Sequence, residues 1–310
     1  MSKKYITTIL IFFFLSAPGA VFALEMPQSG NQLAEMSGVN AQAYVVRDAA
    51  TGEVLISSNP DLAWTPASLT KLITALVVLD SQVKLTKVIT MTADDQTAGD
   101  CTSGGACIKS KAGVQFTVDA LFHAALLPSA NNAANALARS TGLSTSDFAQ
   151  KMNEKAVTLG ATNTHFNEPT GLDPANKTTA GDYAKIIAAA YSNSYLRGIA
   201  ALQNYYLRSS NNSKYNQTIK NTDKLLADQD ITMIGAKTGY LNESKYNFAA
   251  LLKNADGQQL SVVVLGEQHL YSAFAETKLL AGLAEEAKAL AMWNQPSVLG
   301  TTTQLSLTNN

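Results

Sequence analysis

The chain has 310 residues, of which 46% are hydrophobic and 15% are charged, a globular composition with enough length for a sizeable core. Its net charge is −1 and its basic residues form no long cluster, which argues against nucleic acid as a partner. The three histidines are far apart in the sequence and the two cysteines have no histidine beside them, so we expect neither a metal site nor a cofactor.

The first 23 residues have the layout of a secretory signal peptide. Lys3 and Lys4 supply a positive end, Ile6 to Leu15 an apolar stretch, and Val21-Phe22-Ala23 a small-residue cleavage site. The alternative is an uncleaved membrane anchor, but the apolar stretch is short for the ~20 residues that a span requires. We therefore expect residues 1–23 to be removed on export.

The next segments predict an arm followed by a hairpin. Residues 24–40 are polar and contain Gly, Asn and Gln, which is typical of a lead-in arm. Ala43 to Arg47 and Glu53 to Ser57 are short strand-like runs on either side of the turn sequence Ala50-Thr51-Gly52. The folded domain is therefore expected to begin near residue 41.

The middle of the chain predicts helices separated by polar loops. Leu69 to Leu79 has hardly a polar face, which indicates a buried central helix with Ser68 at its start. Residues 90–117 are polar and contain many glycines, so they predict a loop-rich insertion, and residues 203–222 predict an irregular segment. Further helices are expected at Val118–Leu127, Asn132–Arg139, Asp147–Leu159 and Ala180–Tyr191.

The last part of the chain changes to strands and a closing helix. The tail 294–310 has no Lys, no Arg and no amphipathic period, so no interfacial membrane anchor is expected there. Strands at both ends with helices between them predict one mixed α/β domain over residues 41–293, in which the terminal strands form one sheet. The expected elements are strands at Met233–Tyr240, Phe248–Lys253 and Leu260–Gly266, a hairpin turn at Ala255-Asp256-Gly257, and a helix at Ala273–Trp293.

Both cysteines, Cys101 and Cys107, lie in the loop-rich insertion. In an exported protein such a pair predicts a disulfide. The alternative is two free thiols. A zinc site is not expected, because no histidine lies nearby to complete it.

Three short motifs occur in the order that a histidine-free serine acyl-transfer enzyme requires. They are Ser68-Leu69-Thr70-Lys71, Ser129-Ala130-Asn131 and Lys237-Thr238-Gly239. The Ser-x-x-Lys and Ser-x-Asn patterns also occur elsewhere in the chain. The interpretation therefore depends on the order, spacing and context of all three.

The first motif supplies a nucleophile and a base. Ser68 and Lys71 are three residues apart at a helix start, so their side chains lie on one face. Lys71 can take the hydroxyl proton only when neutral, and burial together with a second cation such as Lys237 would lower its pKa. Taken alone, the pair would be interpreted as a helix cap and a surface lysine.

The second motif predicts contacts on the leaving group and the substrate amide. Ser129 can relay a proton to the leaving amine, and Asn131 can form a hydrogen bond with the substrate's amide. Since both follow Pro128, between two predicted helices, the structural alternative is a helix cap.

The third motif predicts a site for the substrate carboxylate and backbone. Lys237 and Thr238 can hold a carboxylate, and Gly239 lets a substrate strand approach closely. The backbone N–H groups of Ser68 and Tyr240 are expected to form an oxyanion hole.

With these motifs the sequence resembles the low-molecular-mass penicillin-binding proteins, the serine D-alanyl-D-alanine peptidases. The likeness runs from about Ala43 to Trp293 and includes Pro66 to Leu72, Leu127 to Ala134, Glu168 to Leu172, Asn221 to Leu226 and Gly235 to Tyr240. Within the family the chain is most similar to the penicillin-binding protein 7 branch, the D-alanyl-D-alanine endopeptidases, through Asn59 to Leu62 and Val77 to Asp80. Two departures are Ala130, where the family often has Gly, and the cysteine-bearing loop.

The resemblance implies a β-lactamase/transpeptidase-like fold, with an antiparallel sheet of N- and C-terminal strands flanked by helices and a helical subdomain in between. It implies peptidoglycan stem peptides as substrates, β-lactams as covalent inhibitors at Ser68, and a periplasmic enzyme without a stable membrane anchor after signal cleavage. A secreted enzyme is the alternative location. The favoured activity is cleavage of D-alanyl cross-links. The alternatives are a D-alanyl-D-alanine carboxypeptidase, a class A β-lactamase using Glu168, and a non-catalytic wall-binding protein.

Overall fold

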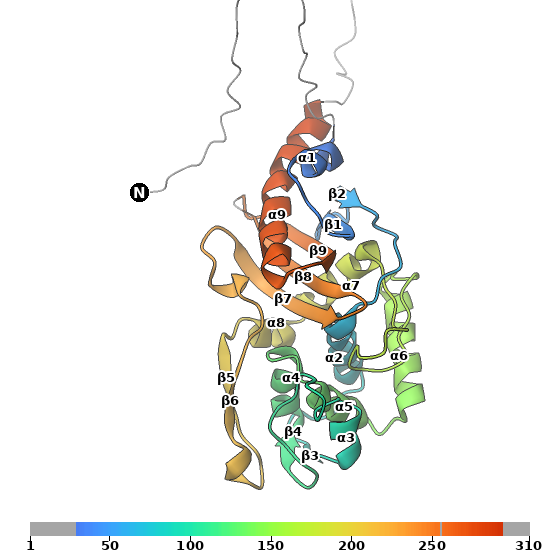
Figure 1. Ribbon diagram of the computed structural model, residues 1–310, viewed down its shortest axis with the longest axis vertical. Coiled ribbons are helices and arrows are strands. Elements are labelled where there is room, and N and C mark those ends of the chain that lie inside the picture. The colour runs from blue at the N-terminus through green and yellow to red at the C-terminus, as the bar shows by residue number, and fades with distance from the viewer. Residues whose placement is uncertain (1–28, 255, 294–310) are drawn as a thin grey trace, which may run out of the picture.

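The computed structural model of the chain describes residues 29–254 and 256–293. The predicted signal peptide, the tail 294–310 and Ala255 of the predicted hairpin turn lie outside the described residues. Figure 1 shows a twisted sheet with its helices in the upper part of the molecule and a mostly helical part below it. Of the helices within the described ranges, none combines the length and the apolar character needed to cross a membrane.

A five-stranded antiparallel sheet joins the two ends of the described chain. The strand order is β2-β1-β9-β8-β7, so the N-terminal hairpin pairs with the last strand, where Val45 lies opposite Val263. The prediction that terminal strands form one sheet is confirmed. The strands are β1 (Ala43–Asp48), β2 (Val54–Ser58), β7 (Thr232–Leu241), β8 (Lys245–Lys253) and β9 (Gln259–Glu267).

Helices cover both faces of this sheet, and the strand residues alternate between them. On β9, Val262 and Val264 pack into one core together with Phe274 of the last helix. Their neighbours Val263 and Leu265 pack into the other core. This alternation follows from the pleat, and it explains why β9 is almost continuously apolar. The first face carries α1 (Gly30–Met36) and α9 (Leu270–Trp293), and the second carries α7 (Ala180–Ser192).

The helix α2 (Thr70–Asp80) is the centre of the helical part, and nine of its 11 residues are buried. The prediction of a buried central helix is therefore confirmed. A short 3-10 turn, Ala67–Leu69, leads into α2 and carries Ser68. The helices around α2 include α4 (Val118–Leu126), α5 (Asn131–Arg139), α6 (Thr145–Thr158) and α7, and α8 (Ser194–Ala200) packs against α4.

Two segments predicted as loops hold short regular elements. The insertion at 90–117 contains α3 (Ala93–Thr97), which begins with a capping box between Thr92 and Asp95, and β4 (Gln115–Thr117), paired with β3 (Val88–Thr90). The segment 203–222 is not irregular throughout, because β5 (Asn204–Leu207) pairs with β6 (Gln217–Lys220). In these two strands only Leu207 and Ile219 are buried, so the hydrophobic alternation is too short to signal a strand.

The segment predicted as a lead-in arm contains α1, which packs against α9 and β2. Gly30 permits this packing, since a Cβ there would lie 2.5 Å from the Leu55 carbonyl oxygen and 2.7 Å from the Ala287 Cβ. Ala34 is fully buried in the same place. Because Gly30 and Ala34 are small, α1 can pack closely against α9 and β2 although most of its other residues are polar.

Candidate active site

The first motif lies where the 3-10 turn runs into α2. The turn starts with Ala67 at φ 50°, a left-handed conformation that costs energy for a residue with a Cβ and often occurs at functional sites. One turn later, the Nζ of Lys71 is 2.8 Å from the Oγ of Ser68. The same Nζ donates to the backbone carbonyl of Thr170 at 2.6 Å, and Lys71 is 1% exposed. A buried amine therefore lies within proton-transfer distance of a partly exposed hydroxyl.

Both lysines of the motifs have lowered pKa values, because burial disfavours the charged ammonium. Burial lowers the pKa of Lys71 to about 7, although the negative charge of Glu168 acts in the opposite direction. The pKa of Lys237 lies well below its usual range, through burial first and repulsion by Lys71 second. We expected burial and a second cation, Lys237, to depress the pKa of Lys71 together; burial is the main cause at both residues, and the repulsion between the two lysines lowers the pKa of Lys237. Near neutral pH, much of Lys71 is thus able to accept a proton.

Ser129 and Ala130 of the second motif lie on the turn between α4 and α5, as predicted, whereas Asn131 is already the first residue of α5. The third motif meets the second at this turn. Ser129 is 6% exposed and has φ 64°. On β7, the fully buried Nζ of Lys237 donates to the Ser129 Oγ at 2.7 Å and to the Thr238 carbonyl at 2.9 Å. Hydroxyl and amine thus meet although 108 positions separate them in the sequence.

The geometry does not support the alternative that these residues serve as helix caps. Both α2 and α5 begin without a hydrogen bond from a capping side chain. By contrast, Thr117, Ser144 and Thr179 cap α4, α6 and α7 through their hydroxyl oxygens. The hydroxyls of Ser68 and Ser129 contact lysine amines instead.

The third motif lies on β7, the last strand in the order of the described sheet, so that one edge of β7 has no strand partner in that sheet. Gly239 packs closely on the 3-10 turn, because a Cβ there would lie 2.8 Å from the Pro66 carbonyl oxygen. Beside it, the Thr238 hydroxyl donates to that of Thr222 at 2.8 Å. Tyr240 follows and is 47% exposed.

A loop outside the three motifs, from Glu168 to Asn176, completes the surroundings of Lys71. The Glu168 carboxylate accepts hydrogen bonds from the backbone N–H groups of Thr170 at 2.7 Å and Gly171 at 2.6 Å, and from the Asn176 amide at 2.9 Å. This fixes the Thr170 carbonyl that receives the Lys71 amine. The sequence signal for this loop is the run from Glu168 to Leu172, which belongs to the family resemblance and contains the carboxylate considered for a class A β-lactamase.

The surroundings of Glu168 bear on the class A β-lactamase alternative, which needs a carboxylate that activates water on the acyl-enzyme. Both carboxylate oxygens of Glu168 are bound within the loop itself. Glu168 lines a separate hollow beside Asp95 and Arg139 and is not among the residues that line the cleft at Ser68. These contacts favour a structural use of Glu168.

A cleft of about 570 Å³ gathers the candidate residues. Lys71 and Lys237 lie behind its surface, in contact with Ser68 and Ser129. A larger hollow, of about 810 Å³, lies beside α6 away from all three motifs. The predicted site residues that line the cleft are Ser68, Ser129, Asn131, Thr238, Gly239 and Tyr240. The lining residues that were not predicted as site residues are Asp100, Ser103, Gly104, Gly105, Ala106, Pro128, Gly171, Leu172, Thr222, Leu241, Asn242, Tyr246 and Leu270.

Comparison with known proteins places this geometry in a family. Residues 30–269 match the sequence model of a peptidase family, S11, described as D-alanyl-D-alanine carboxypeptidase. A D-alanyl-D-alanine endopeptidase of Pseudomonas aeruginosa is 29% identical over 94% of this chain and 92% of its own. The D-alanyl-D-alanine carboxypeptidase DacB2 of Mycobacterium tuberculosis is 36% identical over 73% of this chain and 74% of its own.

Solved structures agree with the sequence comparison. The Streptomyces K15 DD-transpeptidase superposes with a TM-score of 0.74 at 27% identity, over 80% of this chain and 98% of its own. A D-alanyl-D-alanine carboxypeptidase from Mycobacterium tuberculosis superposes with a TM-score of 0.71 at 32% identity, over 80% of this chain and 92% of its own. The predicted mixed α/β transpeptidase-like fold is thereby confirmed.

Proposed function

Because the chain belongs to the S11 family of D-alanyl-D-alanine peptidases, we propose that it hydrolyses D-alanyl peptide bonds of peptidoglycan stem peptides through an acyl-enzyme on Ser68. The observation that carries this proposal is the contact of 2.8 Å between the Ser68 hydroxyl and the buried amine of Lys71. A serine hydroxyl is a weak nucleophile until such a base lies beside it.

In the first step, neutral Lys71 takes the proton from the Ser68 Oγ, which attacks the carbonyl carbon of the D-alanyl residue. Negative charge then develops on the carbonyl oxygen, which faces the backbone N–H groups of Ser68 and Tyr240 as oxyanion hole. Ser129, held by Lys237, relays the proton that Lys71 has taken up to the departing amine, so that the C–N bond breaks, Lys71 is neutral again and the ester on Ser68 remains. Water then attacks the ester carbonyl and gives a proton to Lys71, which returns it to the Ser68 oxygen as the ester C–O bond breaks.

The third motif orients the substrate in this scheme. An extended stem peptide adds to the open edge of β7, and Gly239 lets its backbone approach Ser68. Lys237 and Thr238 attract the substrate carboxylate, and Asn131 forms a hydrogen bond with the substrate amide. A penicillin would present the same carboxylate and amide and acylate the same serine.

Within this chemistry we favour a D,D-endopeptidase that cuts cross-links between stem peptides. The endopeptidase of Pseudomonas aeruginosa aligns over nearly the whole length of both chains. By comparison, the carboxypeptidase DacC of Escherichia coli, 32% identical, aligns over 62% of its own length. A D-alanyl-D-alanine carboxypeptidase is the second candidate, favoured by the 36% identity to DacB2.

The proposed location follows from the substrate. Cross-linked stem peptides lie outside the cytoplasm, and the layout of residues 1–23 is that of a signal for export. We place the mature catalytic domain at residues 41–293 and the enzyme in the periplasm.

The test uses two substrates, a D-alanyl cross-linked muropeptide dimer and a pentapeptide monomer, with the products separated by chromatography. Residues 24–310 should split the dimer into monomers, and a Ser68→Ala variant should leave it intact. Loss of terminal alanine from the monomer alone would assign the carboxypeptidase activity. Cleavage of the dimer by Ser68→Ala would overturn the proposed nucleophile.

A further inference from the structure

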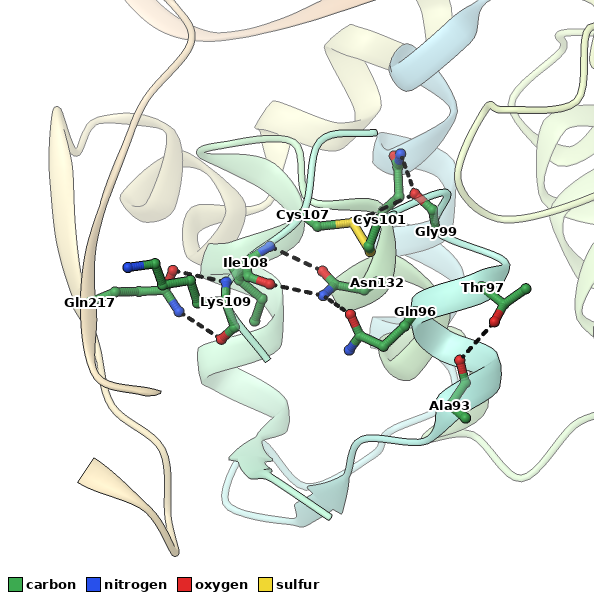
Figure 2. Close-up of a disulfide and its surroundings, with 11 residues drawn as sticks. Ala93, Gln96, Thr97, Gly99, Cys101, Cys107, Ile108, Lys109, Asn132 and Gln217 are labelled. Atoms are coloured by element: carbon green, nitrogen blue, oxygen red, sulfur yellow. Dashed lines mark hydrogen bonds between the residues drawn. A yellow bond between two sulfur atoms is a disulfide. The ribbon is translucent and has the colours of Figure 1, made fainter. Parts of the chain in front are cut away.

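The disulfide between Cys101 and Cys107 closes a small loop at the rim of the cleft. This loop lies between α3 and β4 and contains no helix or strand of its own. Figure 2 shows the disulfide close to Gly99 and Asn132. The loop residues that line the cleft with Ser68 are Asp100, Ser103, Gly104, Gly105 and Ala106.

Asn131, the amide of the second motif, is held by one residue just before this loop, Gly99, and by one at its end, Ala106. The Gly99 carbonyl accepts a hydrogen bond from the Asn131 Nδ2 at 3.1 Å. The Ala106 carbonyl accepts one from the backbone N–H of Asn131 at 2.7 Å. Residues on both sides of the disulfide therefore determine where Asn131 lies.

These bonds also fix how the Asn131 amide is turned. Because its nitrogen faces the Gly99 carbonyl, its oxygen must point the other way. That oxygen is buried and has no hydrogen-bond partner, while Asn131 itself is 3% exposed and lines the cleft. A buried acceptor without a partner is costly, and a hydrogen-bond donor that enters the cleft would satisfy it.

While the disulfide is formed, close packing leaves the Cys101–Cys107 loop little conformational freedom. A Cβ on Gly99 would lie 2.9 Å from the backbone nitrogen of Asn132, and one on Gly105 would lie 2.6 Å from the Gly99 carbonyl oxygen. Asn132 binds both the N–H of Ile108 at 3.2 Å and its carbonyl at 3.1 Å, as Figure 2 shows. The base of the loop is thus anchored by α5, and the disulfide restrains the part that reaches the cleft.

We propose that the Cys101–Cys107 disulfide is a positioning element for substrate binding: it holds the Gly99 and Ala106 carbonyls on Asn131, so that the Asn131 amide group faces the amide group of the substrate. This inference rests on the proposed function and adds to it a residue pair that acts through Asn131. Opening the disulfide would leave the catalytic contacts at Ser68 and Ser129 in place but release the substrate-binding amide.

The test is a double-mutant cycle on the rate at which benzylpenicillin acylates Ser68. The four proteins are the wild type, Cys101→Ser/Cys107→Ser, Asn131→Ala and the combination, each checked for folding by thermal melting. Removing the disulfide should slow acylation by roughly tenfold to a hundredfold, as misplacement of a positioned group does, and should raise KM for the muropeptide more than it lowers kcat. In the Asn131→Ala background, removing the disulfide should have little further effect.

Two controls separate positioning from general loosening. A penam without the acylamino substituent should lose less rate than benzylpenicillin when the disulfide is opened, because it offers no amide to Asn131. Dithiothreitol, which is oxidised to its cyclic disulfide while each cysteine sulfur gains a proton and an electron, should reproduce the loss in the wild type. It should not affect the Cys101→Ser/Cys107→Ser protein.

The possible results distinguish a failure of the positioning role of the disulfide from a failure of the proposed peptidase function. A disulfide-free protein that is acylated at the wild-type rate, or a loss that adds in full to that of Asn131→Ala, would overturn the positioning role. Unfolding on reduction would assign the disulfide to global stability and overturn it as well. If the oxidised wild type is not acylated at all, the proposed function fails and this inference falls with it.

Discussion

The pH dependence of acylation follows directly from the buried position of Lys71. With a pKa of about 7, roughly 90% of Lys71 is neutral at pH 8, whereas an ordinary lysine would be neutral in only about 0.3% of molecules. Burial therefore supplies about 300-fold more of the active base at that pH. Below pH 7 the acylation rate should fall about tenfold per pH unit, to roughly 1% of its plateau at pH 5.

Glu168→Gln tests the electrostatic part of this argument. The Glu168 charge stabilises the ammonium form of Lys71, so its removal should lower the pKa of Lys71 further and move the midpoint of the pH profile to lower pH. The glutamine nitrogen would also face donors of Thr170 or Gly171, which should loosen the loop and lower the plateau rate. The midpoint of the pH profile thus measures the effect of the Glu168 charge on Lys71. The plateau rate measures the effect of the loosened loop.

The assay is the rate of labelling by a fluorescent penicillin from pH 5 to pH 9 at constant ionic strength. Asp80→Asn is the matched control: Asp80 ends the same helix, its side chain is 56% exposed and it pairs with Lys155. This control should keep the wild-type midpoint. A wild-type profile that is flat from pH 5 to pH 8, or a midpoint that rises in Glu168→Gln, would refute the assignment of Lys71 as the base.

Two further predictions concern stability. Gly171→Ala should lower the free energy of unfolding by ~3 kcal/mol or more and slow acylation, because φ is 88° and the new Cβ would collide with the Ala67 carbonyl oxygen. Gly160→Ala, with φ 75° and no atom nearer than 3.9 Å, should cost only about 1 kcal/mol in the same urea titration, and equal losses would contradict the contact argument. Burial and the nearby Glu267 raise the pKa of Glu276 from 4.5 to about 7. The stability that depends on its protonated form is therefore present below pH 4.5 and is lost as the pH rises through about 7. Glu276→Gln should accordingly melt higher than the wild type at pH 8.5 and about equally at pH 4.5, and a constant difference across this range would disprove the titration.

Local signals in the sequence predicted the parts of the site that are close in the chain. Ser68 and Lys71 share a helix face because three positions separate them, and Pro128 ends one helix so that Ser129 falls on a turn. The apolar run from Leu69 to Leu79 identified α2 because a helix without a polar face must be buried. Each of these inferences needs only the geometry of one element.

The features of the site that the sequence could not show are contacts between residues that are far apart in the chain. The bond from Lys71 to the Thr170 carbonyl joins positions 99 apart, and no periodicity encodes it. The orientation of Asn131 depends on Gly99, 32 positions away, through a loop whose composition predicts only irregular structure. In the same way, α1 folds because Ala34 packs into the core under α9, whereas its own sequence is largely polar.

The most direct test of the central claim is the covalent state of the protein after brief exposure to benzylpenicillin. Intact-mass measurement and peptide mapping of residues 24–310 should show one penicillin per molecule, attached at Ser68, and no adduct in Ser68→Ala or in Lys71→Ala within the same time. An adduct on another residue, or multiple rapid turnovers of penicillin without an adduct, would contradict the assignment of Ser68 as the acyl-enzyme nucleophile of a D-alanyl-D-alanine peptidase.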